Sequence, residues 1–315
     1  MKKIMVFLMA AVMAGTSFAA PAAKTSANKA TKKAKAEFVI IEDDVYAAGK
    51  EDVQLTQGVA AFLEAEPVVT HVAVSDAQND TRFAGIQYDF LPVYLIKKTD
   101  AVRSKMAQHI EHGYVKENND FVILEHQTRQ GVYTGKTAKP GVMEIFVMSQ
   151  CPYGVMAENM VIQAKKDGTF PADKEVRLHY IVNYDEKNGF NSLHGSGEWE
   201  EDVRQLLIAK YYPAKLWKDL EIRNKDYRSS RWDIAMEDAG INAKKIMKKF
   251  DTEGLELLKA EAKYADEYGV NASPTFLWEG KVQLDFGTAS QIEGFGFLNP
   301  SKNKPGAAAA PTGSC

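Results

Sequence analysis

The sequence predicts an α/β protein built from two similar units in tandem, the second enlarged by an α-helical insertion. Two segments share the order strand, helix, strand and helical segment, and each ends in a proline turn before an apolar strand. A long stretch with apolar residues at helical spacing interrupts only the second segment. The chain of 315 residues is 45% apolar, which suffices for the cores of two ordinary domains.

The first unit is expected to span residues 38–138. Runs of β-branched residues predict its strands, and apolar residues at helical spacing predict its helix. The expected elements are a strand at 36–44, a helix at 55–66, a strand at 68–75, and a proline turn leading into a strand within 84–98. This unit contains no cysteine.

The second unit is expected to span residues 139–299 and repeats the same order around a helical insertion at about 192–268. Its acidic helix starts and Lys-rich helix ends are typical of helix termini. The expected elements are a strand at 141–149, a helix at 153–168, a strand at 175–185, and a proline turn leading into a strand within 264–287.

The two ends of the chain have compositions unlike the rest. Residues 1–19 combine two lysines, an apolar run and a small-residue cleavage pattern, and they predict a secretory signal peptide. Residues 20–37 are Lys- and Ala-rich without an aromatic, and we interpret them as a flexible basic linker. Residues 300–315 form a Pro/Gly/Ala-rich flexible tail. The expected location is the periplasm or the exterior of the cell.

Each unit carries a proline directly before an apolar strand, in "DFLPVYLI" and "NASPTFLW". Proline cannot donate to a sheet ladder, so it belongs at the first position of a strand, and the cis form costs little there. This arrangement resembles the thioredoxin fold, in which a cis-proline opens the third core strand and faces the active-site cysteine. The resemblance covers 141–299, and 38–136 with less specificity. It implies two tandem thioredoxin-like domains, the first inactive.

The helical insertion resembles that of the periplasmic disulfide oxidoreductases and of proteins similar to the gamma-interferon-inducible lysosomal thiol reductase. The latter carry the signature Cys-Gln-His-Gly, two residues, Glu-Cys, two residues, Asn, four residues, Cys. His194, Gly195 and Glu198 match this signature. Its three cysteine positions and its Asn position hold Ser192, Trp199, Leu207 and Asp202. The resemblance is therefore to the scaffold, with its auxiliary thiols removed.

Cys151 is the candidate catalytic nucleophile. It follows an expected strand and precedes Pro152, which is well tolerated at the first position of a helix. The unpaired N–H groups and the positive end of that helix favour the thiolate over the thiol. The alternative is a buried structural cysteine, because free cysteine is among the most buried residue types.

The second thiol of a C-x-x-C site is missing, because Gly154 stands in its position. A mixed disulfide on Cys151 must then be resolved by glutathione or another small thiol, by the substrate's own second thiol, or by Cys315. A flexible tail of about 15 residues spans roughly 20 Å, which brings Cys315 within reach if the tail starts on the same side. Cys315 is otherwise a stray terminal thiol or pairs with another chain.

The resemblance to thioredoxins also implies the residues that contact a substrate. They lie beside the cysteine and at the facing proline turn: Pro152, Tyr153, Gly154, Ser273, Pro274 and Thr275. We expect no cofactor. We expect no metal site either, since His109 and His112 lie one helical turn apart but no third ligand of clear spacing follows.

The predicted function is an exported monothiol thiol-disulfide oxidoreductase of reductase or isomerase type that acts through Cys151. The alternative is a catalytically degenerate thioredoxin-like binding or chaperone module of the cell envelope. The expected partners are protein thiols or disulfides, with glutathione or a partner reductase. The net charge of −3 gives no support to nucleic-acid binding, and no apolar run after the signal peptide is long enough to span a membrane.

Overall fold

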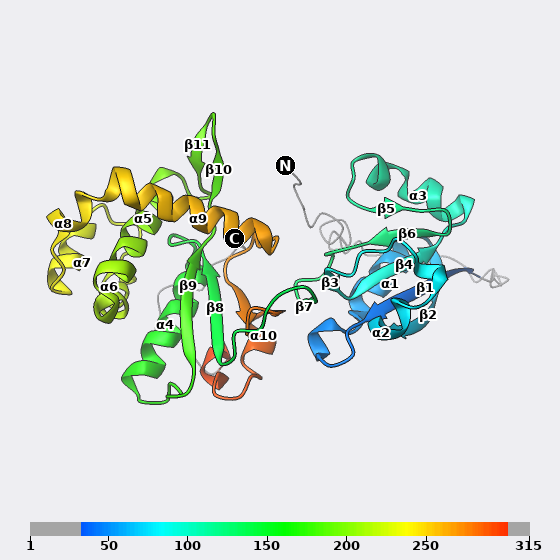
Figure 1. Ribbon diagram of the computed structural model, residues 1–315, viewed down its shortest axis with the longest axis horizontal. Coiled ribbons are helices and arrows are strands. Elements are labelled where there is room, and N and C mark those ends of the chain that lie inside the picture. Colours follow the sequence, from blue (N-terminus) through cyan, green and yellow to red (C-terminus); the bar gives the residue numbers. More distant parts are fainter. Residues whose placement is uncertain (1–32, 302–315) are drawn as a thin grey trace, which may run out of the picture. The chain divides into compact units, whose positions relative to one another are not determined.

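The computed structural model describes residues 33–301 (Figure 1), and the chain divides into two compact units between Lys136 and Thr137. The predicted signal peptide, most of the predicted basic linker and the tail with Cys315 lie outside the described residues. Within 33–301, no helix combines the length and the apolar character that a membrane span requires.

The first unit contains a five-stranded sheet in the order β2-β1-β4-β6-β5, in which β1 and β2 are parallel and the other pairs are antiparallel. The strands of this sheet are β1 (Ala34–Glu42), β2 (Ala65–Ala73), β4 (Val93–Lys97), β5 (Lys116–Glu117) and β6 (Phe121–Leu124). The first unit also contains the short strands β3 (Phe90–Leu91) and β7 (Gly131–Tyr133). Its helices are α1 (Val53–Phe62), α2 (Val74–Ala77) and α3 (Asp100–Glu111), with 3-10 turns at Ala47–Gly49 and Thr81–Phe83.

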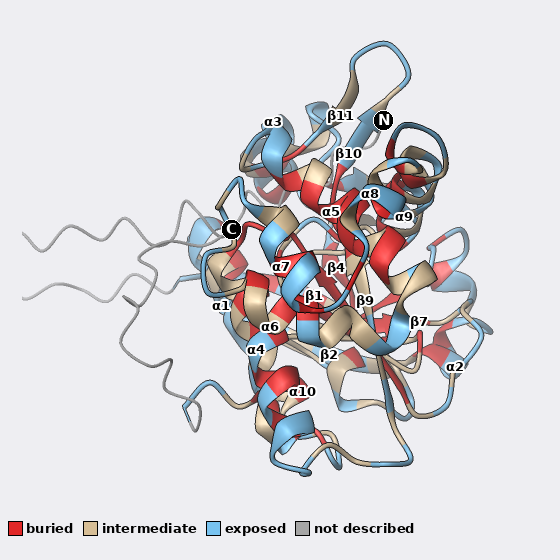
Figure 2. Cartoon of the chain, turned by 90° about the vertical axis from the view of Figure 1, so that its left-hand side faces the viewer, coloured by how far each residue is buried: buried red, intermediate tan, exposed pale blue. Residues whose placement is uncertain are grey.

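The core of the first unit follows from the alternation of side chains along its strands. Along β4, Tyr94 and Ile96 belong to one hydrophobic cluster, whereas Val93 and Leu95 belong to another. Because successive side chains of a strand point to opposite faces, the sheet has a separate core on each face. In Figure 2 the buried residues concentrate on the strands and on the inner faces of the helices.

The second unit is built on four strands in the order β13-β12-β8-β9. The strands β8 and β9 are parallel, and β12 is antiparallel to both β8 and β13. All six residues of β8 are buried, as expected for a central strand covered on both faces. The strands are β8 (Val142–Val147), β9 (Glu175–Tyr180), β10 (Asn183–Asp185), β11 (Gly189–Asn191), β12 (Thr275–Trp278) and β13 (Val282–Leu284).

Most helices of the second unit lie in the predicted insertion (Figure 1). Outside it are α4 (Pro152–Lys166), α10 (Phe286–Ala289) and a 3-10 turn at Gly296–Leu298. The insertion contains α5 (Ser196–Tyr211), a 3-10 turn at Pro213–Lys215, α6 (Leu216–Arg223), α7 (Trp232–Asp238), α8 (Ala243–Met247), a π-helical turn at Phe250–Gly254 and α9 (Leu255–Glu267). The helix α9 ends just before Gly269, which adopts a φ of 61°.

Two features differ from the sequence-based expectations, and a third, the helix α3, lies where no element was predicted. The strand β1 begins at Ala34, inside the predicted linker, because the segment before Phe38 pairs with β2 and buries Ala36. The strand expected at 175–185 is divided after Tyr180, and its end instead forms the β10–β11 hairpin. In the first unit, α3 separates β4 from its antiparallel neighbour β6.

Candidate functional site

Cys151 lies at the junction between β8 and α4, where it is the N-cap residue of the helix. Its backbone is extended (φ −79°, ψ 123°), and Pro152 occupies the start of the helix. The Cys151 N–H donates to the Met148 carbonyl over 2.9 Å, and Val155 N–H donates to the Cys151 carbonyl over 3.0 Å. The sulfur is thereby carried at the positive end of a 15-residue helix, a setting that favours a thiolate.

The proline turn before β12 faces Cys151. The Ser273–Pro274 peptide bond is cis, and the Ser273 carbonyl oxygen lies 3.6 Å from Cys151 Sγ. Ser273 Oγ accepts a hydrogen bond of 3.0 Å from the Met148 N–H. The loop before α4 and the proline turn before β12, more than 120 residues apart in the sequence, therefore contact each other through Met148, Cys151 and Ser273.

The other residues predicted to contact a substrate differ in exposure. Pro152, Tyr153 and Pro274 are partly exposed, so they remain available to a substrate. Gly154 and Thr275 are buried, and the Thr275 hydroxyl donates to the Ala272 carbonyl over 2.8 Å. Because these two residues are buried, they offer no surface to a substrate.

Gly154 is closely packed against three neighbouring residues. A Cβ atom added there would lie 2.6 Å from Ser273 Oγ, 3.1 Å from the Met148 carbonyl oxygen and 3.3 Å from Val147 Cβ. Cβ atoms essentially never approach another heavy atom to within 3.0 Å, so no side chain fits at residue 154 unless its neighbours shift. A side chain at residue 154 would therefore require the Ser273 hydroxyl to move.

Cys151 is completely buried, and its sulfur is engaged in a disulfide bond. Among the residues from 33 to 301, no cysteine is free. The predicted resolving residue, Cys315, belongs to the part of the chain that the structure does not describe.

Two buried carboxyl groups of the second unit were not singled out as functional from the sequence. Glu158, on α4, is 1% exposed, and its Oε2 accepts a hydrogen bond of 2.9 Å from Asn224. Asp202, on α5, is fully buried next to Ser149 and Glu198. Burial raises the pKa of Glu158 to about 8 and holds that of Asp202 well above its usual range. Glu158 sits at an apolar-face position of α4, which is the signal that sequence reasoning overlooked.

Replacing Glu158 with Gln is expected to remove part of the pH dependence of stability. The folded carboxyl keeps its proton up to about pH 8, whereas the unfolded one releases it near 4.5. The stabilisation is complete below the lower value and is lost as pH rises through the higher one. Between about pH 5 and pH 8 the wild type should lose on the order of 3 kcal/mol more unfolding free energy than Glu158→Gln.

Urea unfolding followed by tryptophan fluorescence measures this difference. All four tryptophans belong to the second unit: Trp199, Trp217, Trp232 and Trp278. Wild-type and Glu158→Gln curves that stay parallel across this pH range would contradict the assignment of a protonated Glu158.

The corresponding helix start in the first unit carries no thiol. Asp52 is the N-cap of α1, and its carboxylate accepts hydrogen bonds from the N–H groups of Gln54 (2.9 Å) and Leu55 (3.3 Å). The Leu91–Pro92 bond before β4 is cis, as in the second unit. A capping carboxylate thus occupies the helix start where the second unit places its cysteine.

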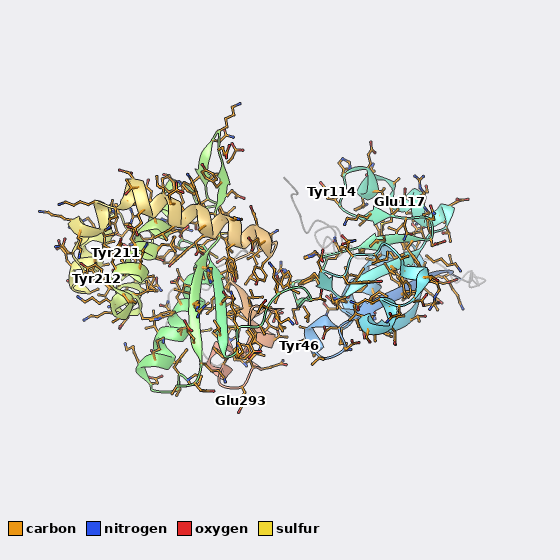
Figure 3. All side chains as sticks on the ribbon, in the orientation of Figure 1. Tyr46, Tyr114, Glu117, Tyr211, Tyr212 and Glu293 are labelled. Atoms are coloured by element: carbon orange, nitrogen blue, oxygen red, sulfur yellow. The ribbon has the colours of Figure 1, made fainter. Side chains whose placement is uncertain are left out.

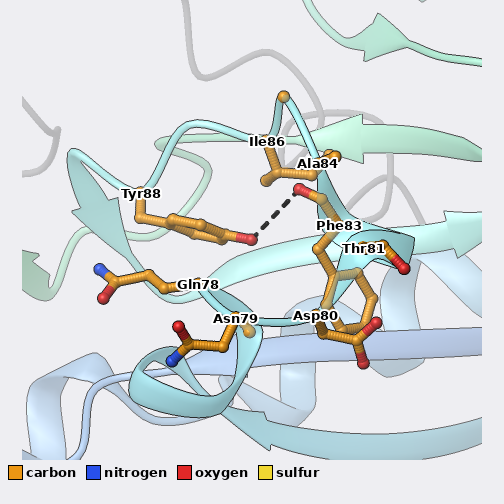
Figure 4. Close-up of a pocket in the computed structure, with 10 residues that line it drawn as sticks. Gln78, Asn79, Asp80, Thr81, Phe83, Ala84, Ile86 and Tyr88 are labelled. Carbon is orange, nitrogen blue, oxygen red and sulfur yellow. Dashed lines mark hydrogen bonds between the residues drawn. The ribbon is translucent and has the colours of Figure 1, made fainter.

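A cavity of about 340 Å³ lies in the first unit, at the loop that follows α2 (Figure 4). Phe83, Ile86 and Tyr88 contribute apolar walls, and the Tyr88 hydroxyl donates to the Phe83 carbonyl over 3.4 Å. Its one acidic group, Asp80, is already paired with Arg82. The lining of this cavity contains no cysteine and no histidine, so it carries none of the predicted thiol chemistry. Within residues 33–301, no three His, Cys, Asp or Glu residues are placed to hold a metal ion.

The aromatic run that ends α5 lies far from Cys151. Tyr211 and Tyr212 lie at the C-terminal end of α5 (Figure 3). A helix of 16 residues is about 24 Å long. The opposite end of α5 contacts the loop before Cys151 through Glu198. Lys249 lies 4.5 Å from the ring centre of Tyr211, so this ring packs within the insertion.

Comparison with known proteins finds similarity at the level of solved structures. The sequence matches no protein-family model, and no curated protein matches it. The disulfide interchange protein DsbA of Klebsiella pneumoniae is 14% identical over 54% of this chain and 89% of its own, with a TM-score of 0.37. SrgA of Salmonella enterica serovar Typhimurium is 14% identical over 54% of this chain and 92% of its own (TM-score 0.39).

The disulfide oxidoreductase DsbA of Proteus mirabilis is 12% identical over 56% of this chain and 92% of its own, with a TM-score of 0.38. The chain is similar to DsbA-type disulfide oxidoreductases, the resemblance predicted from the helical insertion. The parallel β8–β9 pair, the antiparallel β12 and the cis-proline facing Cys151 are its thioredoxin-like features.

Proposed function

We propose that the protein is an exported monothiol thiol-disulfide oxidoreductase of reductase or isomerase type, with Cys151 as its nucleophile. The observation that carries the proposal is the position of Cys151 Sγ at the start of α4, 3.6 Å from the carbonyl oxygen of Ser273. A helix start stabilises the thiolate, which is the reactive form. The first unit, with Asp52 at its helix start, is proposed to be a degenerate copy that binds without redox chemistry.

The reaction transfers two electrons to a substrate disulfide. The Cys151 thiolate attacks one substrate sulfur, so the substrate S–S bond breaks, a mixed disulfide forms, and the departing thiolate takes up a proton. A second thiolate then attacks Cys151 Sγ, and the second substrate sulfur leaves as a thiol after protonation. The substrate is reduced, and Cys151 ends in a disulfide with the resolving thiol.

Cys315 is proposed as the resolving thiol. It is the only other cysteine of the sequence, and the disulfide engagement of Cys151 supports a partner for this sulfur. Because residue 154 is a glycine and α4 contains no second cysteine, the resolving thiol must come from outside this helix. Glutathione, another small thiol or a partner reductase would return two electrons to the resulting disulfide.

The substrates are proposed to be protein disulfides presented as extended segments beside Pro152, Tyr153 and Pro274, which are partly exposed. The DsbA of Proteus mirabilis has been solved with a non-covalently bound peptide. The proposed site of action is the periplasm or the exterior of the cell, following the signal peptide expected at 1–19.

The test is turnover of a protein disulfide with glutathione as reductant. Cys151→Ser should reduce the rate to the uncatalysed background, because Cys151 is the one cysteine within residues 33–301 and it lies at a helix start. Cys315→Ser is the matched variant, and it should retain the first attack while slowing release at low glutathione. A Cys151→Ser protein that turns over like the wild type would overturn the proposal.

The complete burial of Cys151 favours one rival, a binding module without chemistry. Client binding that persists in Cys151→Ser, together with wild-type protein that gives no turnover, would establish this rival in place of the enzyme.

A further inference from the structure

The loop between β8 and Cys151 is held by the helical insertion. Glu198, in the first turn of α5, is fully buried and accepts a hydrogen bond of 3.1 Å at Oε2 from the backbone N–H of Gln150. The Ser149 hydroxyl donates to the Glu198 carbonyl oxygen, also over 3.1 Å. Both residues directly before Cys151 are therefore bound to one residue of the insertion.

The Glu198 carboxylate is itself held in place by His194. The His194 Nδ1 lies 2.6 Å from Glu198 Oε2, and the His194 backbone N–H donates to Oε1 over 3.3 Å. A buried carboxylate must keep such partners, because desolvation without them is costly. His194 therefore contacts both oxygens of the carboxylate and fixes the orientation in which Oε2 accepts from Gln150.

The start of α5 lies close to the loop that precedes Cys151. Gly195 is the N-cap residue of α5 and adopts a φ of 94°, a conformation that favours glycine. A Cβ atom at Gly197 would lie 3.2 Å from the Gln150 side-chain nitrogen. The first turn of α5 is thus shaped to lie against the loop that carries Cys151.

We propose that Glu198, oriented by His194, is the positioning residue for the Cys151 sulfur. This inference rests on the proposed function, since it names what fixes the nucleophile of that same site. A hydrogen bond to a charged acceptor is roughly twice as strong as a neutral one, and here it restrains a peptide unit adjoining the nucleophile. It keeps the sulfur at the helix start and against the Ser273 carbonyl.

The first experiment compares the kinetics of three full-length variants. Glu198→Ala removes the acceptor and should lower kcat for disulfide exchange on the order of 10- to 100-fold, with KM changed less than about twofold. Glu198→Gln keeps an oxygen for the Gln150 N–H and should restore kcat to within about threefold of the wild type. The matched control is Glu200→Gln, on the same helix but partly exposed, which should behave as the wild type.

The inference fails if Glu198→Ala keeps the wild-type kcat, or if Glu198→Gln loses as much as Glu198→Ala. A residue that only stabilises the fold would instead lower the melting temperature and leave kcat per folded molecule unchanged. Tryptophan fluorescence of the second unit supplies that measure of folding.

Hydrogen exchange of the Gln150 amide tests the contact without relying on activity. It should be about tenfold faster in Glu198→Ala and unchanged in Glu200→Gln. If the wild type shows no turnover, the proposed function fails, and the alkylation rate of reduced Cys151 decides the positioning role alone. A rate altered in Glu198→Ala but not in Glu200→Gln supports it, and equal rates overturn it. Should Glu198→Ala not fold, the same two measurements on His194→Ala apply with the same expected directions.

Discussion

Gly154→Ala is expected to lower the free energy of unfolding by about 2–4 kcal/mol, from overpacking and a lost hydrogen bond together. The added Cβ would lie 2.6 Å from Ser273 Oγ. If Ser273 rotates away, the buried Met148 N–H loses its acceptor. Gly154→Cys adds a larger group at the same point, so it should destabilise the protein and not create a working dithiol site.

The matched control is Gly58, in the middle of α1, where an added Cβ meets nothing within 4 Å. Gly58→Ala should stabilise by about 0.5–1 kcal/mol, the ordinary gain for glycine to alanine in a helix. Calorimetry of both variants gives the comparison. A Gly154→Ala protein as stable as Gly58→Ala would contradict the close packing of Gly154 against Ser273.

A double-mutant cycle identifies the cause of the loss. Ser273→Ala removes the hydroxyl that the new Cβ would meet, so part of the cost of Gly154→Ala should disappear in the double variant. Additive losses would show that the strain arises elsewhere, for example at the Met148 carbonyl oxygen, 3.1 Å from the added atom.

Glu201→Ala is expected to cost about 3–5 kcal/mol, because it leaves buried arginines without their counter-charge. Glu201 is 2% exposed. Its Oε2 accepts a hydrogen bond of 2.8 Å from Arg204 Nε, and its Oε1 accepts one of 2.8 Å from Arg223 Nε. Arg223 also donates to the carbonyl oxygens of Asp226 and Ser229. Glu201 therefore joins α5 and α6 in the insertion that holds the active-site loop.

Urea unfolding followed by tryptophan fluorescence measures this loss in the second unit. Glu200→Ala, one residue earlier and partly exposed, should change the unfolding free energy by only about 0–1 kcal/mol. Equal effects of Glu200→Ala and Glu201→Ala would contradict the buried charge network.

Much of the fold could be predicted because it depends on local patterns. The alternation within residues 68–75, the apolar spacing in α1 and the proline before β12 each predict an element without knowledge of distant contacts. The helix start at Cys151 follows from Pro152 in the same way. These signals lie within a few residues of the structure that they predict.

The remainder depends on contacts between distant segments. The packing of Gly154 against Ser273 joins residues more than 100 positions apart, and a glycine in a motif does not reveal what lies beside it. The hydrogen bond between Glu198 and Gln150 also joins residues 48 positions apart. The sequence match of Glu198 to a known signature marked the residue, but only the fold shows what it contacts.

The central claim is that Cys151 attacks a substrate disulfide and that Cys315 releases the product. It is tested most directly by intact mass spectrometry of Cys315→Ser mixed with a protein disulfide and quenched with acid. The account predicts an adduct of protein plus substrate that a reductant removes and whose linked peptide contains Cys151. Absence of this adduct in Cys315→Ser, or an equal amount in Cys151→Ser, would contradict the account.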